Sequence, residues 1–284
     1  MFIVVLGAGA VGGEVVQQLG ARHLGVPVVL VDGRRGVAEG KALDLRQSAP
    51  VDGSASDVRG TDDAAVLRDA ALIVLADESD ARTSASADEA AVLTRLRLIA
   101  SQAPSCAVVV ATAGADLVIA HAVAECGMTA SCLVGAAPEA LRGSLRAVIA
   151  QEARCRPDDV AAAILGRAPD TIIVPWEGCS IGGRCATDVL TPPAIRRIEQ
   201  RLPGLWPPGP HALGRAAAQV ATGIWRDQGE MFCVQVALVR NGTGQRSGPS
   251  AILPARLGRL GVDEVLPVTL TGRDRTRLDS VVSA

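Results

Sequence analysis

Aromatic residues are scarce in this sequence. It contains no Tyr, two Phe and three Trp among 284 residues, so its core must be built from Val, Leu, Ile and Ala. Hydrophobic residues nevertheless make up 49% of the chain, which is enough for a sizeable core and argues against disorder.

Signals for a metal, a membrane or a nucleic acid are also lacking. The chain has three His, and none of its seven Cys forms a CxxC pair, so we expect no metal site. An odd number of Cys spread through expected core elements suits reduced thiols in a cytoplasmic protein. The net charge of −2 gives no basic footprint for a nucleic acid. The first apolar run, Phe2–Leu6, is too short for a signal peptide or a membrane span.

Short apolar runs alternate with helix-period stretches through the first half of the chain. This alternation predicts an α/β fold with a parallel, doubly wound sheet. The strand-like runs are residues 2–6, 28–31, 72–76, 107–111 and 133–134. The apolar residues at helical spacing are Val11, Val15, Val16 and Leu19 in one stretch, and Leu93, Leu96, Ile99 and Ala100 in another.

The second half has a mixed pattern, so we divide the chain into a domain over 1–134 and an α+β domain over 135–284. A strand pair is expected over 160–165 and 171–174, joined by a turn over 166–170. A Pro/Gly-rich break over 202–210 precedes an expected helix over 212–225. Further strands are expected over 231–239, 250–253 and 266–270, with a closing helix over 272–282.

A glycine-rich turn, Gly7-Ala8-Gly9-Ala10-Val11-Gly12, links the first strand to the first helix. Gly7 permits the tight turn, Gly9 lets a pyrophosphate approach the backbone, and Gly12 lets helix and strand pack closely. The free N–H groups of the helix start suit phosphates, and this predicts a Rossmann dinucleotide site that includes Ala10 and Val11.

An acidic residue ends the second strand at the position expected for ribose recognition. Asp32 lies twenty residues beyond Gly12, where its carboxylate would accept from an adenosine ribose 2′-hydroxyl. That predicts NAD rather than NADP, although Arg34 and Arg35 follow closely.

The run over 31–50, VDGRRGVAEGKALDLRQSAP, resembles the malate/lactate dehydrogenase family, in which a ribose-binding Asp precedes a GKALDL stretch. Further similarity lies at Gly60-Thr61-Asp62-Asp63 and at Leu266-Pro267-Val268. The resemblance implies a Rossmann domain followed by that family's α+β domain, NAD as cofactor, and a homodimer or homotetramer.

The family's chemistry uses a His as the proton acceptor, and this residue is missing here. The resemblance places the His within a GGHGDT pattern, where this chain reads Gly166-Arg167-Ala168-Pro169-Asp170-Thr171. Ala168 therefore stands at the His position. The remaining residues, His23, His121 and His211, lie outside every motif.

Other family residues are replaced or ambiguous. The two arginines of the family's mobile loop correspond to Ala81 and Ala87, with Arg82 one place away. The family's LDxxR segment corresponds either to Leu141 and Ser144, without a gap, or to Glu139 and Arg142, with a two-residue shift. We favour a solvated ion pair as the interpretation of Glu139 and Arg142.

Two further departures concern the cofactor. The family's TAG sequence is here Ala76-Asp77-Glu78, and carboxylates close to a pyrophosphate would repel it. Thr112 replaces an Asn that, in the family, helps to hold nicotinamide and substrate.

Three hypotheses follow from these residues. The first is an NAD-binding homologue that has lost ordinary 2-hydroxy-acid dehydrogenase catalysis. The second is an NAD-dependent oxidoreductase for a non-standard substrate, with Glu139, Arg142 or Asp170 recruited. The third is an interaction protein that binds no nucleotide and uses the family's dimer surface.

Overall fold

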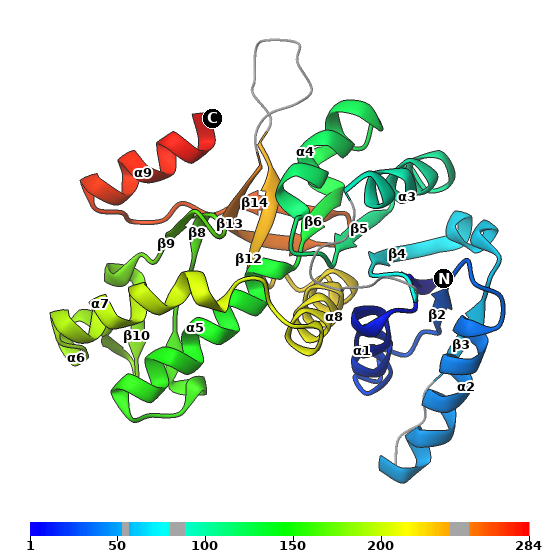
Figure 1. Ribbon diagram of the computed structural model, residues 1–284, viewed down its shortest axis with the longest axis horizontal. Coiled ribbons are helices and arrows are strands. Elements are labelled where there is room, and N and C mark those ends of the chain that lie inside the picture. The colour runs from blue at the N-terminus through cyan, green and yellow to red at the C-terminus, as the bar shows by residue number, and fades with distance from the viewer. Residues whose placement is uncertain (53–56, 80–88, 239–249, 284) are drawn as a thin grey trace.

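The computed structural model describes residues 1–52, 57–79, 89–238 and 250–283. One long sheet crosses the molecule, and helices pack on both of its faces (Figure 1). Its strand order is β3-β2-β1-β4-β5-β6-β12-β13-β8-β9, and β14 pairs with β13.

The first half of this sheet is parallel, as the alternating pattern predicted. Every neighbouring pair from β3 to β6 runs in the same direction. Strands covered on both faces are expected to be continuous apolar runs, which is how they were recognised. Their bounds are β1 (Phe2–Leu6), β2 (Val28–Val31), β3 (Val58–Thr61), β4 (Ala70–Leu75), β5 (Ala107–Val110) and β6 (Leu133–Gly135).

Alternate residues of the parallel strands face two separate cores. Ile3 and Val5 of β1 pack on the side of α1 and α2, whereas Val4 and Leu6 pack on the side of α3 and α4. Successive strand side chains point to opposite faces, so the sheet is doubly wound. The helices are α1 (Ala10–Gly20), α2 (Val37–Ser48), α3 (Glu89–Gln102) and α4 (Ala115–Glu125).

Antiparallel strands extend the sheet. β12 meets β6 at one residue pair, Gln235 opposite Gly135, and pairs with β13 along its whole length. β13 in turn pairs with β8 and β14. Their bounds are β12 (Met231–Ala237), β13 (Ser250–Gly258), β14 (Gly261–Val265), β8 (Leu165–Arg167) and β9 (Thr171–Ile173).

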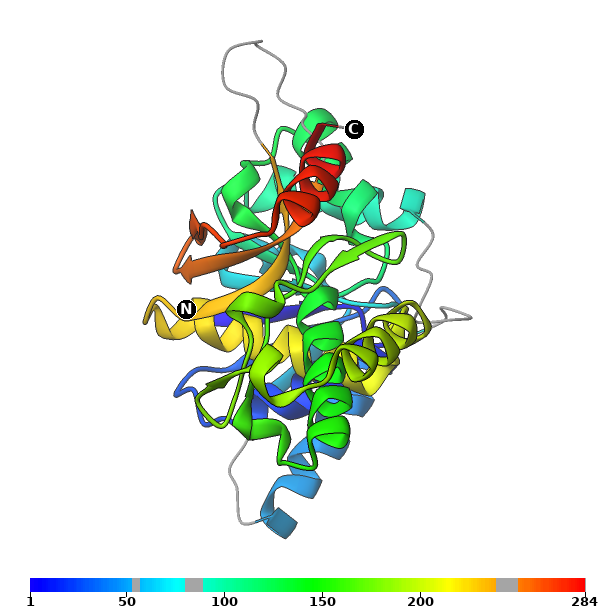
Figure 2. The same cartoon turned by 90° about the vertical axis from the view of Figure 1, so that its left-hand side faces the viewer.

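Helices of the second half pack around these strands. α5 and α7 lie side by side at the end of the molecule remote from α2 (Figures 1 and 2). α8 lies against α1, and this contact joins the two halves of the chain on one face of the sheet. The helices are α5 (Ala137–Ala153), α6 (Ala186–Val189), α7 (Pro192–Arg201), α8 (Pro210–Arg226) and α9 (Gly272–Ser283).

Two expected strands of the second half are wrong. Residues 160–165 are not one strand, because β7 (Val160–Ala161) joins a separate sheet with β10 (Ser180–Ile181) and β11 (Arg184–Cys185), and pairing with β9 begins only at Leu165. Residues 266–270 form no strand, because β14 already takes the edge of β13 and its ladder ends at Val265.

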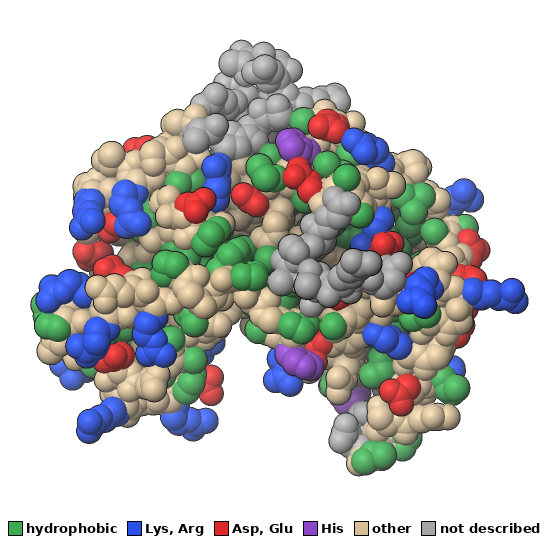
Figure 3. Space-filling model, viewed as in Figure 1, with side chains coloured by type: hydrophobic (Ala, Val, Ile, Leu, Met, Phe, Trp, Pro, Cys, Tyr) green, Lys and Arg blue, Asp and Glu red, His purple; other side chains and the backbone are tan. Residues whose placement is uncertain are grey.

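Side chains of both charge signs are interspersed over the face seen in Figure 3. Within the residues that the structure describes, no helix is long and apolar enough to cross a membrane. All seven cysteines are free thiols, and Cys132, Cys179 and Cys233 among them are buried.

Candidate functional site

The glycine-rich turn has the steric requirements expected of it. Gly7 adopts a φ of 114°, and a Cβ there would overlap the backbone carbonyls of Ala76 and Asp77. A Cβ on Gly12 would overlap the Gly7 carbonyl oxygen, so helix α1 could not start so close to β1. These two positions therefore need glycine for the fold of the turn itself.

The third glycine faces a side chain of the protein. A Cβ built on Gly9 would overlap the carboxylate carbon and both oxygens of Asp77. Asp77 follows β4, and its carboxylate accepts from the N–H groups of Ala10, at 2.9 Å, and Gly12, at 3.0 Å. The start of α1 therefore already has an anion bound to its N–H groups.

Asp32 lies at the end of β2, as expected, but its acceptor positions are used by the protein. One carboxylate oxygen accepts from the N–H groups of Ala8, at 2.8 Å, and Ser79, at 3.1 Å. The other accepts from the N–H of Arg34, at 3.0 Å, and the hydroxyl of Ser79, at 2.9 Å. A carboxylate offers about four lone-pair positions, so none is left for a ribose hydroxyl in this arrangement.

Two cations that the sequence analysis did not assign lie beside these carboxylates. Lys41, from the GKALDL stretch, donates to the Gly9 carbonyl at 2.9 Å. Arg95 of α3 has a side chain that is only 13% exposed, lies 3.8 Å from Glu78 and donates to the Leu6 carbonyl. Burial lowers the pKa of Arg95, and the charges of Glu78, Asp32 and Asp77 oppose that effect.

The residues present do not fit a dinucleotide as they stand. The N–H groups of Ala10 and Gly12 bind Asp77, the space above Gly9 is filled, and the Asp32 carboxylate is fully used. Only a rearrangement of Asp77 would free the helix start for a phosphate.

A separate cavity brings together two positions singled out by the resemblance. Ala168 and Thr112 both line it, and its volume is about 390 Å³. The Thr112 side chain is buried, and its hydroxyl has no hydrogen-bond partner among the described residues. The two positions at which the resemblance places the family's His and Asn therefore share one cavity.

The described charged residues lining this cavity are all acidic: Glu89, Asp116 and Asp170. Glu89 also contacts His121, with 2.7 Å between the carboxylate oxygen and Nδ1. Pro169 and Asp170 also line a neighbouring cavity of about 560 Å³ between β9, α9 and the end of α7. Ala81, Arg82 and Ala87 lie outside the described residues.

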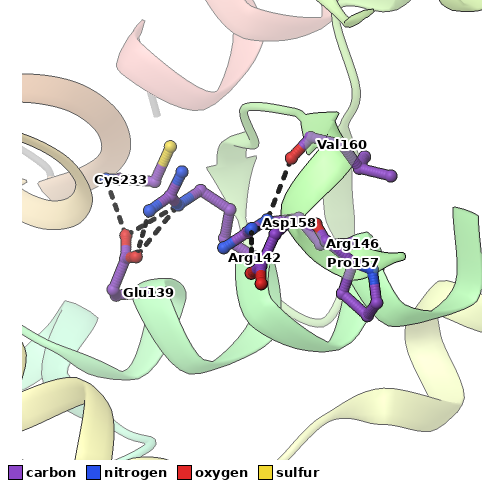
Figure 4. Close-up of polar contacts among 7 residues, drawn as sticks. All are labelled: Glu139, Arg142, Arg146, Pro157, Asp158, Val160 and Cys233. Carbon is purple, nitrogen blue, oxygen red and sulfur yellow. Dashed lines mark hydrogen bonds and ion pairs between the residues drawn. The ribbon is translucent and has the colours of Figure 1, made fainter. Parts of the chain in front are cut away.

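Glu139 and Arg142 form a buried ion pair on α5, away from the cavity lining (Figure 4). Arg142 Nε donates to both Glu139 oxygens, at 2.9 and 3.0 Å, and the Cys233 N–H donates to one of them at 3.2 Å. The expectation of a solvated pair is wrong, because β12 covers Glu139 and leaves its side chain 4% exposed. Burial raises the pKa of Glu139, although Arg142 and the Cys233 N–H oppose the effect.

The gapless alternative for the same segment places its two residues differently. Leu141 is fully buried in the core formed by α5 and its neighbours. Ser144 donates its hydroxyl to the Ala140 carbonyl within the helix. Neither side chain lies at the Ala168 cavity.

The described part of the chain holds no group of three or more His, Cys, Asp or Glu placed to bind a metal. Four neighbours of the two sites were not predicted from the sequence: Lys41, Arg95, Glu89 and Asp116. The GKALDL stretch was a usable signal for Lys41, since it marked the family without giving its Lys a role.

Comparisons with known proteins agree with this fold. Residues 1–135 match the model of the lactate/malate dehydrogenase NAD binding domain. A malate dehydrogenase of Methanosarcina acetivorans is 28% identical over 94% of this chain and 91% of its own. The malate dehydrogenase structure from Salinibacter ruber is 25% identical and covers 99% of this chain and 94% of that chain, with a TM-score of 0.85.

A lactate dehydrogenase structure from Cryptosporidium parvum, complexed with lactic acid and nicotinamide adenine dinucleotide, has the same fold. Its TM-score is 0.86 at 22% identity, and the match covers 99% of this chain and 94% of that chain. The fold, the glycine-rich turn and these matches together support membership of the malate/lactate dehydrogenase family, and residues 1–135 match that family's NAD binding domain directly.

Proposed function

We propose that this chain does not catalyse the oxidation of ordinary 2-hydroxy acids and instead keeps the family's scaffold for another role. The proposal rests on Ala168, which the sequence resemblance places at the family's His position and which lines the cavity with Thr112. Alanine cannot accept a proton, so hydride transfer from a hydroxyl would lack its general base.

The charge of the cavity supports the same proposal. A 2-hydroxy acid carries at least one carboxylate, and the family binds it with an arginine in bidentate fashion. Here the described lining contributes Glu89, Asp116 and Asp170, and no Lys or Arg. Carboxylates that face a carboxylate substrate repel it, more strongly where water is partly excluded.

The test is NADH formation by the purified chain with malate or lactate, followed at 340 nm. The Methanosarcina acetivorans malate dehydrogenase is a suitable positive control. We expect no rate above that of a sample without protein. A substrate-dependent rate within about 100-fold of the control would refute the proposal, since loss of a general base alone removes roughly 100- to 10,000-fold.

A second candidate is an NAD-dependent oxidoreductase that acts on a neutral or cationic alcohol. The unpartnered Thr112 hydroxyl and the surrounding carboxylates favour it, because they would hydrogen-bond a hydroxyl or an ammonium group. NAD reduction with a panel of amino alcohols and neutral alcohols tests this candidate. A positive result there, with malate and lactate inactive, would select it over the first.

The third hypothesis, an interaction protein, concerns the surface rather than the cavities. On the basis of the family alone we propose a homodimer or homotetramer. Light scattering of the purified chain tests it, since a mass near the 29.1 kDa of one chain would contradict it.

A further inference from the structure

We propose that Asp77 serves as a built-in anion in the pyrophosphate position of the glycine-rich turn and excludes dinucleotides from the unmodified protein. Replacing this one carboxylate should then admit them. The inference rests on the turn and its neighbours, so it does not depend on the proposed loss of catalysis.

The first step is hydrogen bonding. A phosphate at the start of a helix is held by free backbone N–H groups. The N-cap of α1 is Gly9, which has no side chain to accept hydrogen bonds from these groups. The Asp77 carboxylate takes the N–H groups of Ala10 and Gly12, one on each oxygen. The Gly9 N–H is used as well, since it donates to the Asp77 carbonyl at 2.9 Å.

The second step is space. Glycine at the middle position of this motif leaves room for a phosphate to approach the backbone. In this protein that room is occupied, because a Cβ on Gly9 would overlap the whole Asp77 carboxylate. The residue Asp77 is only 6% exposed, so its carboxylate is enclosed by the protein.

The third step is charge. Asp32, Asp77 and Glu78 bring three carboxylates to the turn, and the cations near them include, among the described residues, Arg95 and Lys41. Arg95 is held by Glu78 and the Leu6 carbonyl, and Lys41 by the Gly9 carbonyl. A pyrophosphate would add two negative charges beside three carboxylates, of which only Glu78 has an ion pair with one of these cations.

The same residue also stabilises the helix. Because Gly9 cannot cap α1, the remote carboxylate of Asp77 performs that role, and its loss should weaken the start of the helix. The hydrogen bonds that cap α1 are thus the same ones that exclude a phosphate. A binding experiment measures the exclusion, and an unfolding experiment measures the capping.

The experiment is titration calorimetry of the full chain with ADP-ribose and with NAD. Asp77→Ala introduces the residue that the family's TAG sequence has at this position. Asp57→Ala is the matched control, because Asp57 precedes β3 at the opposite edge of the parallel strands and its carboxylate pairs with Arg59. Circular dichroism confirms that each variant is folded.

We expect the unmodified chain and Asp57→Ala to bind both ligands with a Kd above about 1 mM, which is a weak affinity. Asp77→Ala should bind at least tenfold more tightly, and ADP-ribose should raise its Tm. If Asp77→Ala does not fold, Asp77→Asn keeps the size and one acceptor oxygen while removing the charge. It should show a gain in the same direction but a smaller one, because its amide still fills the space above Gly9.

Two results would overturn the proposal. One is micromolar binding of ADP-ribose or NAD by the unmodified chain, which would mean that a phosphate readily displaces the Asp77 carboxylate from the N–H groups of α1. The other is a folded Asp77→Ala or Asp77→Asn variant that binds no more tightly than the unmodified chain. Because the readout is binding, neither result bears on whether the chain turns over a 2-hydroxy acid.

Discussion

Removing the Asp32 carboxylate should cost stability even in the absence of any ligand. This carboxylate accepts four hydrogen bonds, from Ala8, Arg34 and twice from Ser79. Ala8 is fully buried, and in Asp32→Ala its N–H would lose the one acceptor that it has among the described residues, whereas Arg34 and Ser79 can reach water. An unsatisfied buried N–H costs about 1–3 kcal/mol, and a hydrogen bond to a charged group contributes about 1.5–3 kcal/mol.

We therefore expect Asp32→Ala to lower the free energy of unfolding by about 2–4 kcal/mol at pH 7. Asp32→Asn should cost about 1–2 kcal/mol, since its oxygen can still accept from Ala8 and its amide can donate to the Ser79 hydroxyl. Urea unfolding measures both. The control is Asp57→Ala, whose carboxylate is half-exposed with Arg59 and should contribute about 0.5 kcal/mol or less.

The pH dependence gives a second measurement. Burial raises the pKa of Asp32, but the bonds from Ala8, Arg34 and Ser79 outweigh burial and hold the pKa below its ordinary value. A carboxyl with a lowered pKa stabilises the fold above about pH 3.9, and this contribution is lost as the pH falls through the lowered pKa. The difference between the unmodified chain and Asp32→Asn should shrink over that range. Equal stabilities of Asp32→Ala and Asp57→Ala at pH 7 would refute the reasoning.

Three further predictions concern other sites. Ala168→His should give no malate-dependent NADH formation at 340 nm, alone or with Asp77→Ala, because the described cavity lining offers no cation for the substrate carboxylate; measurable turnover would contradict this. Glu139→Ala should lower the free energy of unfolding, measured in urea, by about 2–4 kcal/mol, because it leaves the largely buried Arg142 unpaired. A change within about 0.5 kcal/mol would show that the Glu139–Arg142 ion pair does not stabilise the fold. Glu14→Gln should cost about 0.5–1.5 kcal/mol at pH 7, since the exposed partners His211 and Arg215 are screened by water. Burial raises the Glu14 pKa but these partners lower it overall, so this cost should vanish as the pH falls below about 4.3, and a cost that persists in acid would contradict it.

Local patterns explain which parts of the fold were predictable. The parallel strands are buried on both faces, so they appear as apolar runs, and the turn after β1 needs glycine for local steric reasons. The strand expected over 266–270 failed because pairing depends on which edge is free, and β14 had taken the edge of β13. An apolar run alone does not encode that competition.

The residues of the candidate sites were predictable where they belong to a recognisable sequence motif. The resemblance singled out Thr112 and Ala168 for separate reasons, and the fold places both at one cavity. The sequence indicated that Asp77 would repel a phosphate, but its capture by α1 joins residues 65 positions apart and depends on how β4 meets the turn. The burial of Glu139 likewise depends on β12, far along the chain, which a helical i, i+3 pattern cannot reveal.

The place of β12 in the sheet has a consequence for biosynthesis. Its meeting with β6 at Gly135 and Gln235 closes the edge of the parallel half, yet β12 is made about 100 residues after β6, some 5–20 s later at usual elongation rates. During that interval the nascent chain presents an unpaired, apolar strand edge, which is a template for aggregation. A ribosome-bound chaperone that shields this edge should therefore raise the yield of folded protein, and slower translation should lower it.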